Sequence, residues 1–206
     1  MTIEALRRAL DALKYDAWLN RIDFGATFFV IWSRLVATPR WQEMLAMIVG
    51  DGHEIGVHYA GRWGWCRSPR SYIEDEGRLL VAYVRRNFGK KVRYVRPPGG
   101  LATWPFVDAH YNVLGLETVI GTGYAFDVDL CACRSPAVQG RLTAEMAAGK
   151  DNVISIFHDG GPTALDLAVK TRAFVDAMLE CGHNVVTLEE LLRDDDAENE
   201  LLEVAE

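Results

Sequence analysis

The sequence predicts an α/β fold whose mostly parallel sheet forms a barrel or partial barrel. Strand and helix patterns alternate from about residue 26 to residue 192, which is typical of parallel strands joined by crossover helices. The predicted strands are short, which favours a barrel. The segment Gly121-Thr122-Gly123 is too weak a motif to indicate a phosphate loop, and the sequence has no dinucleotide-binding fingerprint.

Local signals place the elements of the first half of the chain. An amphipathic helix over residues 3–13 leads into a β-rich run. Pro39 and the pair Ser68-Pro69 are helix-start signals, and glycines end each helix. The expected strands are 26–32, 54–57 and 92–95, and the expected helices are 39–47 and 69–88.

The second half continues the same alternation. Residues 152–157 form the clearest buried strand, and the helix after them has one apolar face. The run Thr187-Leu188-Glu189-Glu190 is a capping box that begins a last short helix. The other expected elements are a helix over 104–114 and strands near 118–120, 124–126 and 184–186.

Composition predicts a single domain over residues 1–193, followed by an acidic, disordered tail over 194–206. The chain has 206 residues, half of them hydrophobic, and a formal charge of -7. Without the seven carboxylates of the tail, 22 acidic residues face 22 basic residues. A neutral body lacks the basic surface that nucleic acids require, so nucleic acid is not an expected partner. The four cysteines show no disulfide spacing, and no long apolar stretch predicts a membrane segment, so we expect a cytoplasmic protein.

Four predicted strands are each followed directly by a residue capable of chemistry. These residues are His58, Arg96, Asp127 and His158. Each one alone could cap its own strand. Catalytic groups of parallel α/β folds gather at the carboxyl ends of the strands, however, so the set as a whole favours a functional site.

Strand alternation separates the two histidines of the stretch GHEIGVHYAGRWG. His53 and His58 are an odd number of residues apart, so they should point to opposite sides of an extended segment and should not share a metal. His53 is then a structural residue and His58 the candidate ligand or acid–base group. The residue four positions after His58 is Arg62, which cannot ligate a metal.

Five motifs in order resemble those of the polysaccharide deacetylases of the NodB homology type. They are ATFFVIW, GHEIGVH, YVRPPGG, AFDVDL and ISIFHDGG, and they cover roughly residues 24–192. The resemblance implies a distorted or incomplete (β/α) barrel, here with about six parallel strands. It also implies a divalent metal, often zinc, that activates water to remove acetyl groups from sugars.

The resemblance assigns roles to individual residues. His58 matches the first metal-binding histidine, and Arg62 replaces the second. Arg96 matches the arginine that orients the catalytic base, and the aromatic residue expected after Pro98 is Gly99. Three further matches lie later in the chain: Asp127 as the residue that tunes the acid, Asp129 in the same stretch, and His158 as the catalytic acid.

The family's first motif, a TFDDG-like strand end that carries the catalytic base and a metal-binding aspartate, has no match in this sequence. We therefore expect an uncovered sheet edge, which the N-terminal segment or a second copy of the chain would cover. A catalytic zinc usually has three protein ligands, and only His58 is matched.

Three functions follow from these residues. The first is hydrolysis of an N-acyl or amide bond in a sugar or small molecule, with His158 as the acid. The second is metal-free acid–base chemistry with His158, Asp127 and Arg96, as in an isomerase, lyase or cyclase. The third is a non-catalytic protein that binds a saccharide or a protein.

The loop after His58 is the candidate substrate-binding segment. It carries Arg62, Trp63 and Trp65, and Pro98 and Asp129 complete the expected substrate-binding set. Aromatic rings can stack on sugar rings and arginines pair with carboxylates, so the loop suits a glycan or an anionic small molecule. A tryptophan lid that only fills space is the alternative.

Overall fold

The computed structural model describes residues 24–60, 69–124, 135–150, 152–157 and 164–193. The chain divides into two compact units. The N-terminal unit consists of residues 26–120 and 187–189, and the C-terminal unit contains the described parts of 24–25, 121–186 and 190–193. The single domain over 1–193 stays a prediction.

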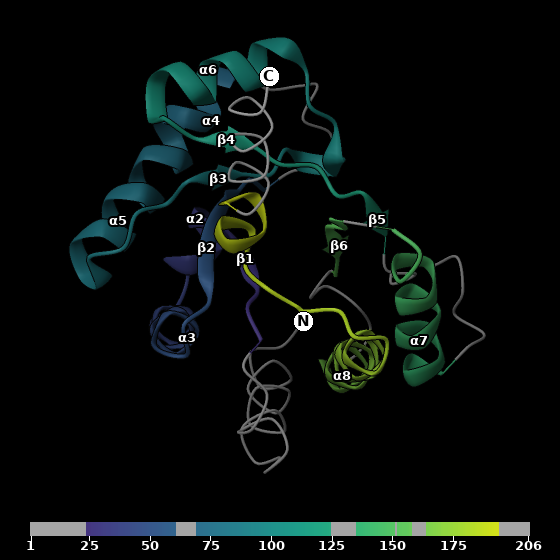
Figure 1. Cartoon of the computed structure of the whole chain (residues 1–206). Helices are drawn as coiled ribbons and strands as arrows, with labels where there is room; N and C mark the ends of the chain where they lie inside the picture. Colours follow the sequence, from purple (N-terminus) through teal and green to yellow (C-terminus); the bar gives the residue numbers. More distant parts are fainter. Residues whose placement is uncertain (1–23, 61–68, 125–134, 151, 158–163, 194–206) are drawn as a thin grey trace. The chain divides into compact units, whose positions relative to one another are not determined.

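A four-stranded parallel sheet forms the centre of the N-terminal unit. Its strands are β1 (Thr27–Ile31), β2 (Glu54–His58), β3 (Tyr94–Val95) and β4 (Glu117–Thr118). They lie side by side in the order β1-β2-β3-β4, and all pairings are parallel (Figure 1). The longest pairing runs from Thr27 opposite Glu54 to Ile31 opposite His58.

The helices of this unit begin and end at the proline and glycine signals of the sequence. The helical elements are α2 (Trp32–Leu35), α3 (Pro39–Gly50), α4 (Pro69–Tyr72), a π-helical turn (Ile73–Gly77), α5 (Arg78–Phe88), a 3-10 turn (Pro98–Gly100) and α6 (Trp104–Leu114). Prolines stand in the first turn of α3, α4 and α6, and Gly89 and Gly115 end α5 and α6 with left-handed φ values of 65° and 64°.

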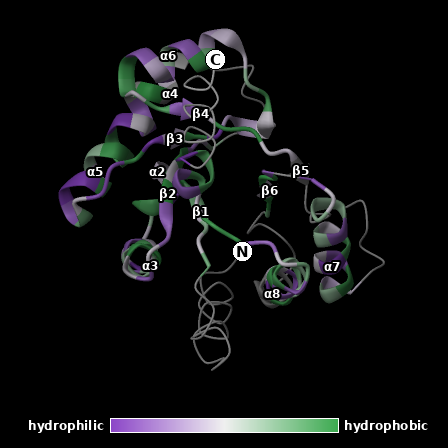
Figure 2. Ribbon diagram, in the orientation of Figure 1, coloured by the Kyte–Doolittle hydropathy of each residue, from purple (hydrophilic) through white to green (hydrophobic). Residues whose placement is uncertain are grey.

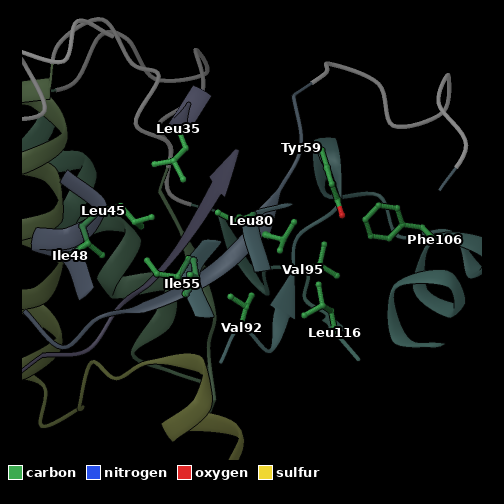
Figure 3. Packing of buried hydrophobic residues seen from close by; sticks show 12 residues of the cluster. Leu35, Leu45, Ile48, Ile55, Tyr59, Leu80, Val92, Val95, Phe106 and Leu116 are labelled. Atoms are coloured by element: carbon green, nitrogen blue, oxygen red, sulfur yellow. The ribbon is translucent and has the colours of Figure 1, made fainter. Parts of the chain in front are cut away.

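One face of the sheet packs on these helices. Ile55 and Val57 of β2 and Val95 of β3 are buried in one cluster with side chains of α2, α3, α5 and α6 (Figure 3). Helix α5 has the matching amphipathic pattern, with Leu80 and Val84 fully buried and the charged residues Arg78, Arg85 and Arg86 exposed (Figure 2). Burial of each such side chain contributes about 1.5–3 kcal/mol, so this cluster fixes the sheet against its helices.

The other face of the sheet carries the alternate side chains. Thr27, Phe29 and Ile31 of β1 share it with Glu54, Gly56 and His58 of β2, because paired residues of parallel strands point the same way. A Cβ atom on Gly56 would lie 2.5 Å from Cε1 of Phe29. Gly56 therefore gives the Phe29 ring the space to cover the middle of this face.

The C-terminal unit holds a second, two-stranded parallel sheet. Strand β5 (Gly123–Tyr124) pairs with β6 (Ser155–Ile156). Helices α7 (Pro136–Ala147) and α8 (Ala164–Glu180) pack through Ala144, Ala147, Phe174, Val175 and Met178. Residues 188–193, which span both units, are also helical.

The expected α/β fold of parallel strands in an incomplete barrel is confirmed. The described residues contain six strands in two parallel sheets, and neither sheet closes on itself. The N-terminal helix over residues 3–13 and the acidic tail over 194–206 lie outside the described residues.

Several local predictions were wrong or incomplete. Of the buried strand expected over 152–157, only Ser155–Ile156 is a strand, and it is half-buried. Trp32 belongs to α2 and not to the strand, because the chain turns into a helix as soon as β1 ends. Residues 184–186 form no strand, although the Gly25 amide donates to the Val185 carbonyl at 2.8 Å. Helix α7 was not predicted, and the long helix predicted over 69–88 is interrupted by the π-helical turn.

Gly140 of α7 provides a test of the packing in the C-terminal unit. A Cβ atom there would collide with the Lys170 carbonyl of α8 and lie 3.0 Å from the Ala173 Cβ. We expect Gly140→Ala to lower the free energy of unfolding by about 1–3 kcal/mol, measured by urea denaturation, because the backbone of α8 must shift. In Gly149→Ala the new Cβ has open space, so that variant should stay close to wild type. Equal stability of the two variants would contradict this packing.

Candidate functional site

His58 lies at the carboxyl end of β2 with one ring nitrogen fixed by the backbone. Its Nδ1 is 2.8 Å from the carbonyl oxygen of Arg96. A carbonyl only accepts hydrogen bonds, so Nδ1 carries the proton and Nε2 of the neutral ring carries the lone pair. Metal-binding and proton-accepting histidines are commonly held this way. His58 therefore has the chemistry of a ligand or of a proton acceptor.

Arg96 follows β3 directly and is joined to the same strand end. Its amide donates to the Val57 carbonyl at 2.9 Å, a bond that belongs to the Val57–Val95 pair of β2 and β3. The Arg96 side chain is only 8% exposed. A guanidinium so buried needs partners, and it places a permanent positive charge at the carboxyl edge of the sheet.

The Pro97–Gly100 turn fixes the chain after Arg96. Pro97 and Pro98 are buried, and the Gly100 amide donates to the Pro97 carbonyl at 3.1 Å. Gly99 and Gly100 have left-handed φ values of 67° and 72°. A side chain at position 99 would be strained there, so the backbone itself favours glycine where the family pattern expects an aromatic residue.

His53 lies at the opposite end of β2. Five strand residues span about 16 Å, so His53 and His58 do not share a site. The His53 ring packs near Phe28, with ring centroids 5.4 Å apart, and burial lowers the pKa of His53 while nearby Asp51 raises it. This position agrees with a structural role.

A buried hydrogen-bonded chain anchors the residue after His58. Tyr59 is 1% exposed and His110 of α6 is fully buried. His110 Nδ1 lies 2.7 Å from the Phe106 carbonyl, so its Nε2 accepts from the Tyr59 hydroxyl, also at 2.7 Å. Figure 3 shows the Tyr59 ring beside Phe106, with ring centroids 6.1 Å apart. The pair ties the exit of β2 to α6. Sequence reasoning missed it, although Tyr59 directly follows His58.

Glu76 is a second residue that sequence reasoning did not find. Its side chain is 6% exposed and lies on the π-helical turn, a feature common at functional sites. The Ser33 hydroxyl donates to Glu76 Oε1 at 3.5 Å, and Ser33 belongs to α2, which directly follows β1. The helical spacing around Glu76 gave no signal that this carboxylate is buried at the carboxyl edge.

The amino edge of the sheet carries a different polar cluster. The Thr27 hydroxyl donates to Glu54 Oε2 at 2.7 Å, and the Glu189 amide approaches the same oxygen at 3.3 Å. Arg93 pairs with Glu189 at 3.0 Å. Burial raises the pKa of Glu54, and its bond from Thr27 lowers that pKa in part. These contacts hold residues 187–189 against the sheet, and we interpret them as structural.

The described side chains do not by themselves make a zinc site. Across the described ranges, no group of three or more His, Cys, Asp or Glu side chains could hold a metal ion. A catalytic zinc usually takes three protein ligands, and His58 fits one of those positions.

The remaining expected site residues lie outside the described residues. They are Arg62, Trp63, Trp65, Asp127, Asp129 and His158. The structure brings His58, Arg96 and Pro98 together at the carboxyl edge, and the roles of the other six stay predictions.

The buried pair of Tyr59 and His110 yields a stability prediction. Tyr59→Phe removes the donor to a buried nitrogen, so we expect the free energy of unfolding to fall by about 1–3 kcal/mol in urea denaturation at pH 7.5. Phe88→Leu, a change at a partly buried core residue without a polar group, should cost less than about 1.5 kcal/mol. A Tyr59→Phe variant as stable as wild type would contradict the hydrogen bond.

The same pair predicts a pH dependence. Burial lowers the pKa of His110, and its bond to the Phe106 carbonyl raises that pKa in part. A histidine whose folded pKa lies below the unfolded value of about 6.5 contributes stability above that pH, which is lost as the pH falls through the folded pKa. Wild type should therefore lose more stability between pH 7.5 and pH 5 than His110→Gln does. His53 titrates in both proteins, so its contribution cancels.

Comparison with known proteins agrees with this arrangement. The family described as polysaccharide deacetylase matches residues 12–119, just over half of the chain. No curated protein matches the sequence significantly.

No helix within the described ranges has the length and apolar character needed to cross a membrane.

Several solved structures share the fold. The peptidoglycan deacetylase PdaC from Bacillus subtilis has a TM-score of 0.71 and 20% identity, over 98% of this chain and 90% of that chain. The Xyl-CE4 domain of a multidomain xylanase from the hindgut metagenome of Trinervitermes trinervoides has a TM-score of 0.73 and 21% identity. The match covers 93% of this chain and 85% of that chain. A CE4 family pseudoenzyme from Bacillus anthracis has a TM-score of 0.67 and 22% identity. The match covers 93% of this chain and 62% of that chain.

At these identities the solved structures show the fold, and the family match rests on the sequence itself. With the ordered motifs, the parallel sheet and the His58–Arg96 edge, that match shows that this chain belongs to the polysaccharide deacetylase family.

Proposed function

We propose that this chain hydrolyses the N-acyl bond of a saccharide at the carboxyl edge of the β1–β4 sheet. The observation that carries this proposal is the hydrogen bond between His58 Nδ1 and the Arg96 carbonyl, which fixes the imidazole at this edge next to the buried residue Arg96. Membership of a family that acts on polysaccharides supplies the substrate class.

The described residues perform two tasks in this proposal. Nε2 of His58 accepts a proton or coordinates a cation, because Nδ1 is occupied by the Arg96 carbonyl. The Arg96 guanidinium stabilises negative charge, either on a carboxylate partner or on the oxyanion that develops as the acyl carbon becomes tetrahedral. A divalent metal would supply activated water, and His58 could hold one of its positions.

His158 and Asp127 complete the reaction in the proposal. Water passes a proton to Nε2 of His58 as its oxygen adds to the acyl carbon, the C–N bond breaks, and His158 donates the proton that converts the leaving nitrogen to an amine. The products are a carboxylate and an amino sugar. Asp127 orients His158 and keeps it protonated. Asp129 and the loop residues Arg62, Trp63 and Trp65 contact the sugar.

Acetate release tests this assignment. Purified wild type is assayed on acetylated chitin oligomers, acetylxylan and peptidoglycan, with zinc, cobalt, nickel or manganese and with chelator. His158→Ala should lower the rate by about 10²–10⁴-fold, because the leaving amine loses its proton donor. His183→Ala is the matched control, since the His183 ring has its described hydrogen bond with the Ala148 carbonyl of the C-terminal unit, and it should keep its rate. Equal rates for the two variants would overturn the role of His158.

A second candidate function is saccharide binding without turnover. Arg62 occupies the position of the family's second metal-binding histidine, and a permanent positive charge there opposes a bound cation. One solved structure with this fold is of a CE4 family pseudoenzyme, so the fold persists in a protein described as catalytically inactive. Bound saccharide without acetate release in any metal would favour this candidate.

Replacement of Arg62 tests the metal site directly. Arg62→His supplies an imidazole four residues after His58, so we expect it to retain zinc after dialysis, measured by elemental analysis, and to raise acetate release. Arg67→His places the same imidazole elsewhere in the loop and serves as the matched control. Equal zinc content in the two variants would contradict a metal site built on His58.

A cytoplasmic location and self-association remain predictions of the sequence.

A further inference from the structure

The two most exposed large hydrophobic side chains of the described residues both lie on α6. Trp104 is 85% exposed and Tyr111 is 63% exposed, whereas the next most exposed, Met146, is at 52%. Large aromatic side chains normally bury most of their surface, and neighbouring exposed ones often mark a binding surface. Here they stand on the helix that begins at the candidate site.

The two rings form a line along one side of α6. Seven residues separate them, which corresponds to about 10.5 Å along the axis and about 20° of rotation. The separation is about the length of two linked hexose units. On the same side, Asp108 Oδ1 accepts a hydrogen bond from Asn112 Nδ2 at 2.8 Å, and both residues are exposed. The surface thus combines flat apolar rings with a carboxylate and an amide.

Contacts on the buried side of α6 hold the helix in place. Phe106 and His110, on the other side of α6, are buried, and His110 bonds to Tyr59 at 2.7 Å. The helix is therefore fixed to the residue that follows His58. Pre-organised aromatic rings lose little conformational freedom when a ligand binds.

One turn of the chain joins the candidate site to α6. Arg96, the buried Pro97 and the Gly99-Gly100 pair lead to Leu101, which is 51% exposed, and then to Trp104 at the first position of α6. The exposed rings therefore begin eight residues after Arg96 along the chain.

We propose that Trp104, Asp108, Tyr111 and Asn112 bind a saccharide chain at a second site outside the strand-end site. Each sugar ring presents C–H groups on its face to an aromatic ring and hydroxyls at its rim to the Asp–Asn pair. The choice of a saccharide rests on the proposed function. A protein partner fits less well, because Asp108 and Asn112 interrupt the apolar surface that a protein contact would bury.

Binding to insoluble polymers tests this site without any turnover. Wild type is sedimented with chitin, acetylxylan or peptidoglycan, and we expect it to bind at least one of them. Trp104→Ala and Tyr111→Ala should each weaken that binding about tenfold. Trp104→Phe, which keeps a flat ring, should retain most of it. Val113→Ala is the matched control, since Val113 is 48% exposed on α6 but faces away from the two rings, and it should bind as wild type does.

Several outcomes would overturn the proposal. They are wild type that binds none of the three polymers, a Trp104→Ala variant that binds as wild type does, and an oligomer that becomes monomeric in Trp104→Ala by light scattering. The last result would assign the surface to contacts between copies of the chain.

The two proposals fail separately. Binding that depends on Trp104 but comes without acetate release would leave the second site in place and reject the deacetylase. The opposite result is acetate release from a soluble acetylated disaccharide, together with polymer binding that does not change when Trp104 is replaced. It would support the deacetylase and reject the second site.

Discussion

The parallel register of β2 with its two neighbours is the constraint on which the candidate site depends. Ile31 pairs with His58 on one side, and the Arg96 amide reaches Val57 on the other. Together these contacts place the end of β2 between the exits of β1 and β3, and they bring the Arg96 carbonyl to His58 Nδ1. The orientation of the imidazole is thus set by backbone hydrogen bonds, which a change of side chain elsewhere does not easily disturb.

The two edges of this sheet show how a parallel fold separates stability from chemistry. At the amino edge, Glu54 accepts from the Thr27 hydroxyl and the Glu189 amide, and Glu189 pairs with Arg93, so the charges there hold residues 187–189 against the sheet. At the carboxyl edge, the Arg96 carbonyl holds His58 Nδ1 and the Val57 carbonyl accepts from the Arg96 amide, so backbone groups orient the residues proposed for chemistry. This division is expected of (β/α) folds, where the carboxyl ends carry function.

Sequence patterns predicted the elements whose signals are local and strong. Prolines and glycines placed α3 and α6, whereas His53 and His58 are separated by the length of β2 and not by strand alternation, because His53 lies before the strand. The failures have a common physical cause, which is tertiary contact. Helix α7 lacks a strong apolar period and is fixed by close packing of Gly140 on α8, while Glu76 is buried by a π-helical turn that shifts the helical register. The helical pattern around His110 does not indicate its hydrogen bond, which depends on the contact between α6 and Tyr59.

The fold and its chemistry can change independently in this chain. The imidazole of His58 keeps the tautomer and the backbone partner that suit a ligand, yet the sequence places arginine four residues later, where the family pattern has a second histidine. An added positive charge disfavours a cation and favours an anionic or neutral polar group in the same space. Since the geometry at His58 depends on the sheet and not on the metal, loss of the second ligand need not disturb the fold. The aromatic surface of α6 rests on the same buried Tyr59–His110 contact, so it too persists whichever reaction the strand-end site carries out.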